Sequence, residues 1–311
     1  MQGARVTGWG HYLPERIVTN ADFEARLETS DAWITERTGI RERRMGGTTS
    51  SLAIEAGLEA IKSAGLVPTD IDFLILSTTT PDQTVPATSA FVSDKIGTRG
   101  GAMDINAACA GYVYALVVAK SLIATGHSKI LVIGSDTLSK ITDQEDRSTA
   151  VLFADGAGAV VVEASDTDDF LGWDLGVDGS AVDILFCDHG GYLKMEGREV
   201  FKRAVRAMVG SAQNAMARAG VTADQISLVV PHQANLRIIE AANDRLGLSI
   251  EKTAIVLDRT GNTSSGSVPI ALAQAADAGR LHNDDLVLFC GFGAGMTWAS
   301  SVLRWSADGH R

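Results

Sequence analysis

The sequence predicts a mixed α/β fold in which mostly parallel sheets are covered by helices. Short apolar segments alternate with longer segments of helical periodicity along most of the chain, and this alternation is typical of strand–helix–strand units. A second observation is an internal repetition at a spacing of 156 residues: Ala115-Leu116, Ala119 and Leu131–Ile133 recur as Ala271-Leu272, Ala275 and Val287–Phe289. Because any two helix–strand units can match in this way, the repetition is only a modest indication of two similar halves.

The strands expected in the first half are short apolar runs. They lie at Val6–Gly10, Phe73–Ser77, Ala102–Asn106, Ile130–Gly134 and Ala159–Glu163, with helices at Leu52–Ala64, Ala87–Ile96 and Tyr112–Ala119. The helix over 52–64 places Ile54, Leu58 and Ile61 on one face, and Ser51 is its expected N-cap and Gly65 its end. The glycine-rich segment Asp155–Gly158 precedes a strand rather than a helix, so we expect a tight turn there and not a nucleotide-binding loop.

The second half continues the alternation. Its expected helices are Val200–Ala219, Leu236–Leu246 and Val268–Ala278, and its expected strands are Leu228–Val230, a short one near Ile255–Leu257, Leu286–Phe289 and Trp298–Leu303. Ligands in such folds bind at the carboxyl ends of strands, so the residues that follow these strands are the first functional candidates.

Composition excludes several classes of protein. The 311 residues are 45% hydrophobic and 21% charged, which allows a large core, and no apolar run reaches the roughly 18 residues that cross a bilayer. The chain opens without the apolar stretch of a signal peptide, and its three cysteines lack metal-ligand spacing, so we expect a reduced, cytoplasmic protein with no metal site and no membrane segment. The net charge of −11 argues against general binding of nucleic acid.

Cys109 is the most informative residue of the chain. It lies between the expected strand Ala102–Asn106 and the expected helix that follows it, among small residues that leave room for a substrate carbonyl. A helix N-terminus favours a thiolate, which is the reactive form of cysteine. The alternative is that Cys109 is a small core residue, which is the commonest fate of an intracellular cysteine. Cys187 and Cys290 lie in apolar sequence and are expected to be inert.

Two downstream segments favour the nucleophile. His232 follows the strand Leu228–Val230, and Asn262 lies in a loop rich in glycine and serine ahead of another apolar helix. Alone, a histidine after proline is more often a capping or surface residue, and an Asn-Thr pair is more often a turn. Together, the three residues supply a nucleophile and two neutral hydrogen-bond donors at the ends of their elements.

These segments resemble the thiolase superfamily of condensing enzymes, and within it most closely the beta-ketoacyl-(acyl carrier protein) synthase III family. The resemblance runs nearly end to end and is carried by the segments 8–14, 31–44, 104–112, 155–159, 231–235, 261–264 and 291–298. It implies a five-layered α-β-α-β-α fold built from two similar halves, residues 1–163 with the cysteine and residues 164–311 with the histidine and asparagine. It also implies a homodimer.

The resemblance further implies a reaction and its substrates. Cys109 would accept the acyl group of an acyl-CoA as a thioester, with the backbone N–H groups of Cys109 and Ala294 holding the oxyanion. Relatives commonly have Gly at the position of Ala294, and a backbone donor tolerates that change. Malonyl-ACP (the malonyl thioester of acyl carrier protein) would then lose CO2 beside His232 and Asn262, and the enolate would attack the acyl group to give 3-oxoacyl-ACP. No cofactor is expected besides these two substrates.

Binding residues are carried over from the same resemblance. Trp33, Arg37, Thr38 and Arg147 match positions that contact the adenine and phosphates of CoA, and Phe201 and Asn235 match residues that line the pantetheine tunnel. The alternatives are a half-buried anchor for Trp33, a surface ion pair for Arg37 and core packing for Phe201.

Three basic residues, Lys202, Arg203 and Arg237, are expected to form a patch for an acidic carrier protein beside the tunnel mouth. Scattered solvated charges are nearly as good an explanation, and Asp244 stands where relatives can have a basic residue. Val85 matches a loop that closes the partner subunit's acyl pocket. Acetyl-selective members often have Phe there, so the smaller side chain predicts a primer longer than acetyl, or a branched one.

Other functions remain open at this point. A condensing enzyme or acyltransferase of secondary metabolism, of polyketide type, has the same fold. A non-catalytic ketosynthase partner subunit is less favoured, because such subunits usually lose the nucleophile or a donor. A biosynthetic thiolase is disfavoured, because we find no second catalytic cysteine before the final glycine-rich turn.

Overall fold

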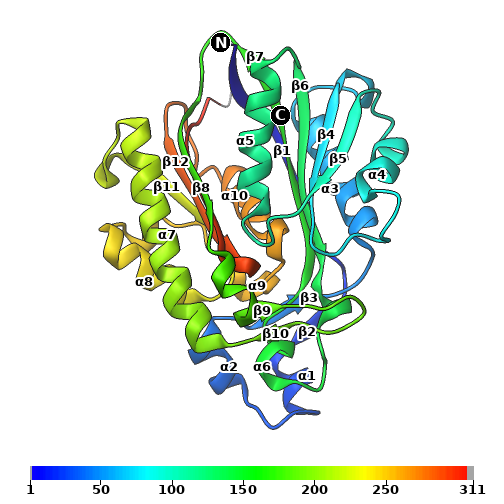
Figure 1. The fold of residues 1–311 in the computed structure, drawn as a ribbon, viewed down its shortest axis with the longest axis vertical. Coiled ribbons are helices and arrows are strands. Elements are labelled where there is room, and N and C mark those ends of the chain that lie inside the picture. Colours follow the sequence, from blue (N-terminus) through cyan, green and yellow to red (C-terminus); the bar gives the residue numbers. More distant parts are fainter. Residues whose placement is uncertain (1, 307–311) are drawn as a thin grey trace.

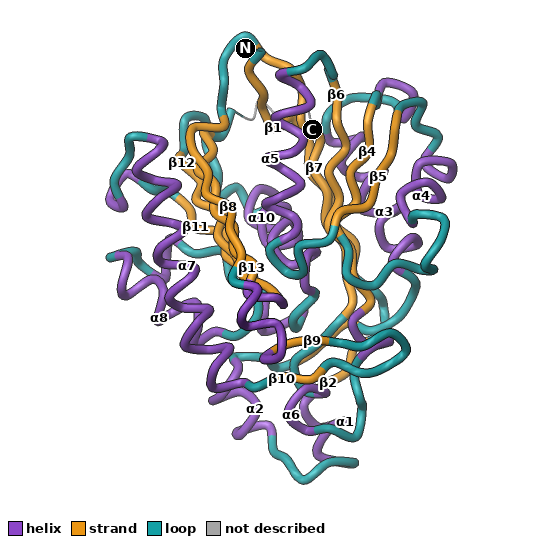
Figure 2. The backbone as a smooth tube through the Cα atoms, viewed as in Figure 1, coloured by secondary structure: helices purple, strands orange, loops and turns teal. Residues whose placement is uncertain are grey.

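The computed structural model describes residues 2–306 as five layers in the order α-β-α-β-α (Figure 1, Figure 2). One sheet has the strand order β1 (Gly3–Tyr12), β7 (Asp155–Ser165), β6 (Lys129–Thr137), β4 (Phe73–Ser77) and β5 (Gly101–Ile105). The other has the order β11 (Leu228–Pro231), β12 (Leu286–Gly293), β13 (Thr297–Arg304) and β8 (Phe170–Val177). The five-layered fold predicted from the resemblance is therefore correct.

The sheets are mixed rather than mostly parallel, which corrects one expectation. Only β4–β5, β4–β6 and β11–β12 are parallel pairs, whereas β1–β7, β6–β7, β12–β13 and β8–β13 are antiparallel. The antiparallel pair β12–β13 is joined by a short turn, and no long helix intervenes between β6 and β7. A parallel pair needs a crossover element, and these connections do not supply one.

Helices form the other three layers. α3 (Thr49–Ser63) and α4 (Thr88–Ile96) cover the outer face of the larger sheet, and α7 (Gly197–Ala219) and α8 (Leu236–Leu246) cover the outer face of the smaller one. α5 (Gly111–Ala124) and α10 (Ser267–Asp277) lie between the sheets (Figure 1). Both central helices are apolar on nearly every side, and a helix of that composition is stable only when it is buried all round.

The smaller elements lie mainly at one end of the molecule. They are α1 (Asn20–Glu24), α2 (Asp31–Thr38), α6 (Arg147–Ala150), α9 (Leu257–Thr260), and the short strand pairs β2 (Ile17–Thr19) with β3 (Glu42–Arg44) and β9 (Leu185–Phe186) with β10 (Lys194–Met195). None of the helices in residues 2–306 combines the length and the apolar character that crossing a membrane requires.

The two sheets repeat one topology. The order β1-β7-β6-β4 corresponds to β8-β13-β12-β11, and each neighbouring pair has the same orientation in both sheets. The place of β5 is taken by a single parallel bridge between Val229 and Thr253. This repetition supports the division into residues 1–163 and 164–311, which we retain as a proposal.

The strand expected near Ile255–Leu257 is wrong, because the side chain of Gln233 binds the backbone there. The side-chain amide of Gln233 donates to the carbonyl of Ala254 at 3.0 Å and accepts from the N–H of Val256 at 3.1 Å and of Leu257 at 3.3 Å. These are the backbone groups that a ladder would use, so a buried side chain replaces the missing strand.

Two local expectations are also corrected. Asp155–Gly158 is not a turn but the start of β7, because a Cβ at Gly158 would lie 2.6 Å from the backbone nitrogen of Ile270 in α10. The glycine therefore permits close helix–strand packing. Helix α3 begins one turn earlier than expected: Thr48 is its N-cap, and Ser51 completes a capping box by accepting the Thr48 N–H at 2.9 Å. Gly65, at φ +70°, follows the end of the helix as expected.

Candidate active site

Cys109 lies between β5 and α5, two residues before the first helical residue, Gly111. The preceding residue, Ala108, has φ +49°, and its N–H donates to Oδ1 of Asn106 at 3.0 Å. Residues without glycine's freedom occupy this left-handed region at a cost, and they do so mostly at functional sites. The local backbone is therefore shaped to present the cysteine.

The thiol faces a cavity of about 260 Å³. Cys109, Ala294 and Ser264 line it together with Thr79, Phe153 and Cys187. Cys187 was expected to be inert in apolar surroundings, but the residue lines this cavity, and its thiol contacts the carbonyl oxygens of Asp188 and Gly191. Cys290 is buried, as expected.

Cys109 rests as a protonated thiol, contrary to the expectation that the helix N-terminus favours a thiolate. Burial raises the pKa of Cys109 to about 12, and the carboxylate of Asp136 acts in the same direction, whereas the hydroxyl of Ser264 lowers it. Loss of water around the sulfur therefore outweighs the local donors. Deprotonation must accompany attack on the substrate.

His232 is buried and neutral at the end of β11. Its Nδ1 lies 2.7 Å from Oγ of Ser267, and burial lowers the pKa of the imidazole to about 3. The same Ser267 oxygen accepts the backbone N–H of Gln233 at 3.2 Å, which leaves the serine proton for Nδ1. From this network we assign the tautomer with hydrogen on Nε2, so that His232 is a hydrogen-bond donor toward the site.

This assignment predicts that the condensation rate has no step from His232 between about pH 5.5 and 8, where an ordinary imidazole titrates. The folded pKa lies below the unfolded value of 6.5, so the group's contribution to folding is complete above about pH 6.5 and declines as the pH falls toward 3. Imidazole NMR signals recorded against pH test this. A titration of His232 near 6.5 in the folded protein would contradict the buried neutral state.

Asn262 is fixed by backbone and side chain together. Its N–H donates to the carbonyl of Leu152 and its carbonyl accepts from Ala154 N–H, each at 2.9 Å. Its Oδ1 accepts the N–H of Ser264 at 2.9 Å, so the amide NH₂ is the free end. Among residues 2–306, neither Nε2 of His232 nor Nδ2 of Asn262 has a hydrogen-bond partner.

The end of β12 brings the histidine and the cysteine together. A Cβ placed on Gly291 would lie 3.4 Å from Cβ of His232 and 3.9 Å from the carbonyl oxygen of Cys109. A Cβ on Gly293 would lie 2.6 Å from the backbone nitrogen of Cys109, so glycine is required there. Ala294 follows directly and lines the cavity of Cys109.

Asp136 holds the two sides of this site together. This fully buried carboxylate has seven donor contacts, of which five come from Thr78, Thr79 and Thr80 at 2.7–3.1 Å and two from the N–H and Oγ of Ser265. Thr79 lines the cavity, and Ser265 belongs to the loop that carries Asn262 and Ser264. Satisfying a buried carboxylate with this many donors rigidifies both segments.

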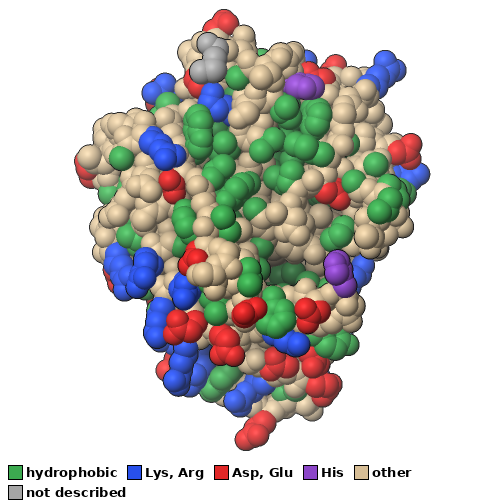
Figure 3. All heavy atoms as spheres, in the orientation of Figure 1, with side chains coloured by type: hydrophobic (Ala, Val, Ile, Leu, Met, Phe, Trp, Pro, Cys, Tyr) green, Lys and Arg blue, Asp and Glu red, His purple; other side chains and the backbone are tan. Residues whose placement is uncertain are grey.

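The predicted CoA-contact residues Trp33, Arg37 and Arg147 lie together at the end formed by α2 and α6. Both guanidinium groups lie 4.8 Å from the centre of the Trp33 ring. The buried Arg43 beneath them donates to the carbonyl of Val151 and lies 4.8 Å from the Phe23 ring, which anchors this end to the chain leading into β7. On the face shown in Figure 3, charged side chains gather at this lower end.

Two other predicted binding residues, Thr38 for CoA and Asn235 for the tunnel, are used internally. Thr38 is buried, and its hydroxyl donates to the carbonyl of Ile34 at 2.7 Å and accepts from Ile40, so it offers no free group to a ligand. Asn235 caps α8 and donates to the carbonyl of Arg37 at 2.9 Å, which joins α8 to α2.

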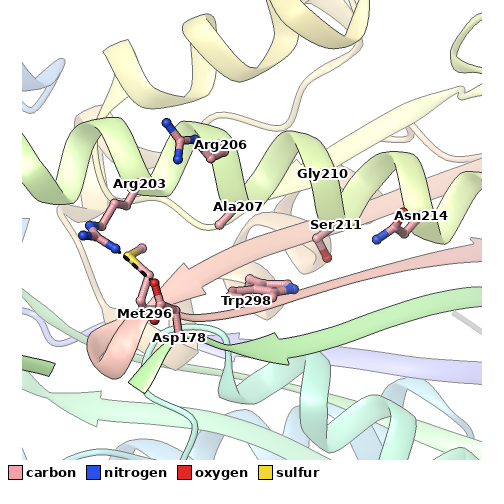
Figure 4. Close-up of a pocket in the computed structure, with 9 residues that line it drawn as sticks. All are labelled: Asp178, Arg203, Arg206, Ala207, Gly210, Ser211, Asn214, Met296 and Trp298. Carbon is pink, nitrogen blue, oxygen red and sulfur yellow. Dashed lines mark hydrogen bonds and ion pairs between the residues drawn. The ribbon is translucent and has the colours of Figure 1, made fainter. Parts of the chain in front are cut away.

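The expected basic patch is divided. Arg203 pairs with Asp178 at 3.0 Å and lines a separate cavity of about 410 Å³ between α7 and the smaller sheet, with Arg206 and Trp298 (Figure 4). Lys202 pairs with Glu199 at 2.9 Å. Arg237 lies 5.9 Å from the centre of the Phe201 ring. Only Lys202 and Arg237 keep positions next to the predicted tunnel residues.

Several contributing residues were missed by sequence reasoning. Ser264 and Ser267 were seen only as part of the glycine- and serine-rich loop that carries Asn262, and Asp136, which lies just beyond the expected strand Ile130–Gly134, was not singled out. The enrichment of that loop in serine is the one signal that the sequence holds. Within residues 2–306, no cluster of three or more His, Cys, Asp or Glu side chains is arranged to hold a metal ion.

Comparison with known proteins gives one consistent result. The family model described as 3-oxoacyl-[acyl-carrier-protein (ACP)] synthase III matches residues 103–179, and its C-terminal counterpart matches residues 216–305. The beta-ketoacyl-[acyl-carrier-protein] synthase III of Oceanobacillus iheyensis is 45% identical over 306 residues, which cover 96% of this chain and 98% of that protein.

Solved structures agree. The 3-oxoacyl-[acyl-carrier-protein] synthase III from Aquifex aeolicus VF5 superposes with a TM-score of 0.96 at 44% identity, covering 97% of this chain and 100% of that one. The priming beta-ketosynthase from the R1128 polyketide biosynthetic pathway superposes with a TM-score of 0.94 at 34% identity, covering 98% and 97%. The fold and the site thus define a condensing enzyme of the acyltransferase type. The chain belongs to the beta-ketoacyl-[acyl-carrier-protein] synthase III family.

Proposed function

We propose that the protein joins an acyl-CoA primer to malonyl-ACP by decarboxylative Claisen condensation, giving 3-oxoacyl-ACP, CO2 and CoA, as the initiating step of fatty-acid synthesis. The observation that carries the proposal is the meeting of a cavity-facing thiol, Cys109, with two neutral side chains, His232 and Asn262, whose N–H groups have no protein partner among residues 2–306. The purified protein, supplied with acyl-CoA primers and carboxyl-labelled malonyl-ACP, should release labelled CO2 and form 3-oxoacyl-ACP. CO2 release without a condensed product would contradict the proposal.

Acyl transfer is the first half-reaction. The Cys109 sulfur bonds to the acyl carbon while the CoA sulfur leaves, and the thiol proton ends on CoA, so the half-reaction is neutral overall. The N–H groups of Cys109 and Ala294 are proposed to hold the tetrahedral oxyanion. Since the thiol pKa is about 12, the thiolate forms only as the attack proceeds.

Decarboxylation is the second half-reaction. As the malonyl carboxylate leaves as CO2, negative charge develops on the thioester oxygen, toward which His232 and Asn262 donate. Two neutral donors stabilise this enolate more than the starting carbonyl, which is the condition for catalysis. The enolate carbon then bonds to the acyl carbon, and Cys109 leaves as a thiolate and takes up a proton.

We propose that the adenine of CoA stacks at Trp33 between Arg37 and Arg147, and that Phe201 and Asn235 lie along the tunnel wall. We exclude Thr38 from the proposed CoA contacts, because its hydroxyl is already hydrogen-bonded to the backbone of Ile34 and Ile40. Trp33→Ala is expected to raise KM for acyl-CoA about tenfold with kcat nearly unchanged, because stacking is lost equally in ground and transition states. An acyl-pantetheine, which lacks the adenine, provides the control. If its KM rises equally, Trp33 does not bind the base.

The carrier protein and a second copy of the chain are the proposed macromolecular partners. Arg237 supports docking of an acidic carrier beside the tunnel, whereas Lys202 and Arg203 each already pair with a carboxylate, that of Glu199 and that of Asp178. Among residues 2–306, the outer edge of β5 has no strand partner, and apolar side chains gather on the face shown in Figure 3, where a second copy would cover them. Val85 is 79% exposed and away from its own cavity, as expected of a residue that serves the partner subunit's acyl pocket. A solution mass of twice 32.7 kDa tests the homodimer.

Two further expectations are carried as proposals. The unpaired cysteines support a reducing, cytoplasmic location. Because His232 and Asn262 supply the electrophilic stabilisation of the enolate, we propose that acyl-CoA and malonyl-ACP suffice without a cofactor.

The second candidate function is priming of polyketide synthesis, which the likeness to the R1128 enzyme favours. The acyl-CoA with the highest kcat/KM distinguishes initiation of fatty-acid synthesis from priming of polyketide synthesis. Retention of Cys109, His232 and Asn262 argues against a non-catalytic subunit.

A further inference from the structure

The hydroxyl of Ser264 is a buried polar group without an ordinary hydrogen bond. Ser264 is 1% exposed, and among residues 2–306 its Oγ has no hydrogen-bond partner. The residue lines the same cavity as the Cys109 thiol. Burying a hydroxyl without an ordinary partner lowers stability, so one that borders a reaction cavity points to an acceptor that becomes strong only during the reaction.

The position of the Ser264 side chain is set by its backbone. Ser264 has φ +51°, in the left-handed region that serine rarely adopts. Its N–H is held by Oδ1 of Asn262 at 2.9 Å, and the next residue, Ser265, is held by Asp136 through its N–H at 3.0 Å and its hydroxyl at 2.7 Å. A strained residue fixed on both sides indicates that the placement of its side chain matters.

The sulfur of Cys109 is the group on which this hydroxyl acts. The Ser264 side chain lowers the pKa of the Cys109 thiol, whereas burial and the Asp136 carboxylate raise it. A neutral thiol is a weak acceptor and a thiolate is a strong one. The interaction of the Ser264 side chain with the neutral sulfur is therefore weak, and it strengthens to a full hydrogen bond when the sulfur becomes charged.

We propose that Ser264 is a further catalytic residue, whose hydroxyl donates a hydrogen bond to Sγ of Cys109 while that sulfur carries negative charge. In acyl transfer, the sulfur gains charge as its proton departs toward the leaving CoA. In condensation, the sulfur leaves the acyl carbon with the electron pair of the broken C–S bond and is protonated afterwards. Ser264 keeps its own proton in both steps. The role in these steps rests on the proposed function, whereas the interaction with sulfur does not.

Alkylation of Cys109 by iodoacetamide tests the interaction without either substrate. The sulfur bonds to the reagent carbon, iodide leaves with the electron pair, and the thiol proton passes to the buffer. Ser264→Ala is expected to lower the rate constant about tenfold between pH 7 and 9, because a hydrogen bond to a charged group is lost. Acylation by acyl-CoA should fall by a similar factor. Peptide mass mapping separates reaction at Cys109 from reaction at Cys187.

The sign of the effect separates this role from a structural one. A loosened site would expose the thiol and speed alkylation, so an unchanged or faster rate in Ser264→Ala overturns the proposal. Ser264→Gly also lacks the hydroxyl, and glycine readily adopts the positive φ of this position. This variant replaces Ser264→Ala in the test if Ser264→Ala does not fold, and its rate of Cys109 alkylation must fall as well. Thr263→Val removes the neighbouring buried hydroxyl, which is also unpartnered within residues 2–306, and should leave the rate unchanged. If the wild type transfers no acyl group, the proposed function fails while the alkylation result still stands.

Discussion

Cys109→Ala is expected to lower the rate of 3-oxoacyl-ACP formation by about four orders of magnitude or more, because the acyl group then has no covalent carrier. No other thiol in residues 2–306 is placed to replace it. Cys187 lines the cavity but donates to two backbone carbonyls, and Cys290 is buried behind the site. The measurement is product formation from acyl-CoA and malonyl-ACP by mass spectrometry.

The same variant separates the two half-reactions. His232 and Asn262 are untouched in Cys109→Ala, so malonyl-ACP should still lose CO2, now to give acetyl-ACP rather than a condensed product. Cys187→Ala is the matched thiol control and should form product. Condensation that survives in Cys109→Ala would show that another group carries the acyl chain.

His232→Ala and Asn262→Ala are each expected to lower malonyl-ACP decarboxylation by about 10²–10³-fold, the usual effect of removing one oxyanion donor. Acylation of Cys109 should remain within a few-fold of the wild type, since burial keeps His232 neutral with a pKa of about 3 and makes it a poor base for the thiol. CO2 release and the acyl adduct are measured on the same samples.

The double variant and a conservative replacement sharpen this test. Because both donors serve one oxygen, the loss in the double variant should be smaller than the product of the single losses. Asn262→Asp places a carboxylate where negative charge develops and should be worse than Asn262→Ala. If acylation falls as steeply as decarboxylation in His232→Ala, the histidine activates the cysteine instead, and the proposed assignment of roles fails.

Local signals in the sequence predicted much of the fold. Phe73–Ser77 and Leu236–Leu246 have the bounds expected of them, because an apolar run and an amphipathic repeat ended by Gly247 depend on nearby residues alone. The strand near 255–257 failed because the side chain of Gln233, distant in sequence, binds its backbone. The turn expected at Asp155–Gly158 is wrong because glycine is typical of close packing as well as of turns, and only the position of α10 distinguishes the two.

The site shows the same limit. Cys109 and His232 each follow an expected strand that the structure contains, and Asn262 precedes an expected helix, so their convergence could be anticipated. The protonated state of the thiol could not, since it depends on burial. Nor could the seven contacts of Asp136, which join β6 to segments that precede it by over 50 residues and follow it by 129. Such interactions are set by the packing of the two halves.

Intact-protein mass spectrometry after exposure to a panel of acyl-CoAs, followed by malonyl-ACP, tests the central claim most directly. We expect an adduct of the acyl mass that is absent in Cys109→Ala and that malonyl-ACP removes as 3-oxoacyl-ACP, with the strongest adduct identifying the primer. An adduct that malonyl-ACP cannot remove, or the absence of an adduct with every acyl-CoA, would contradict decarboxylative condensation through Cys109.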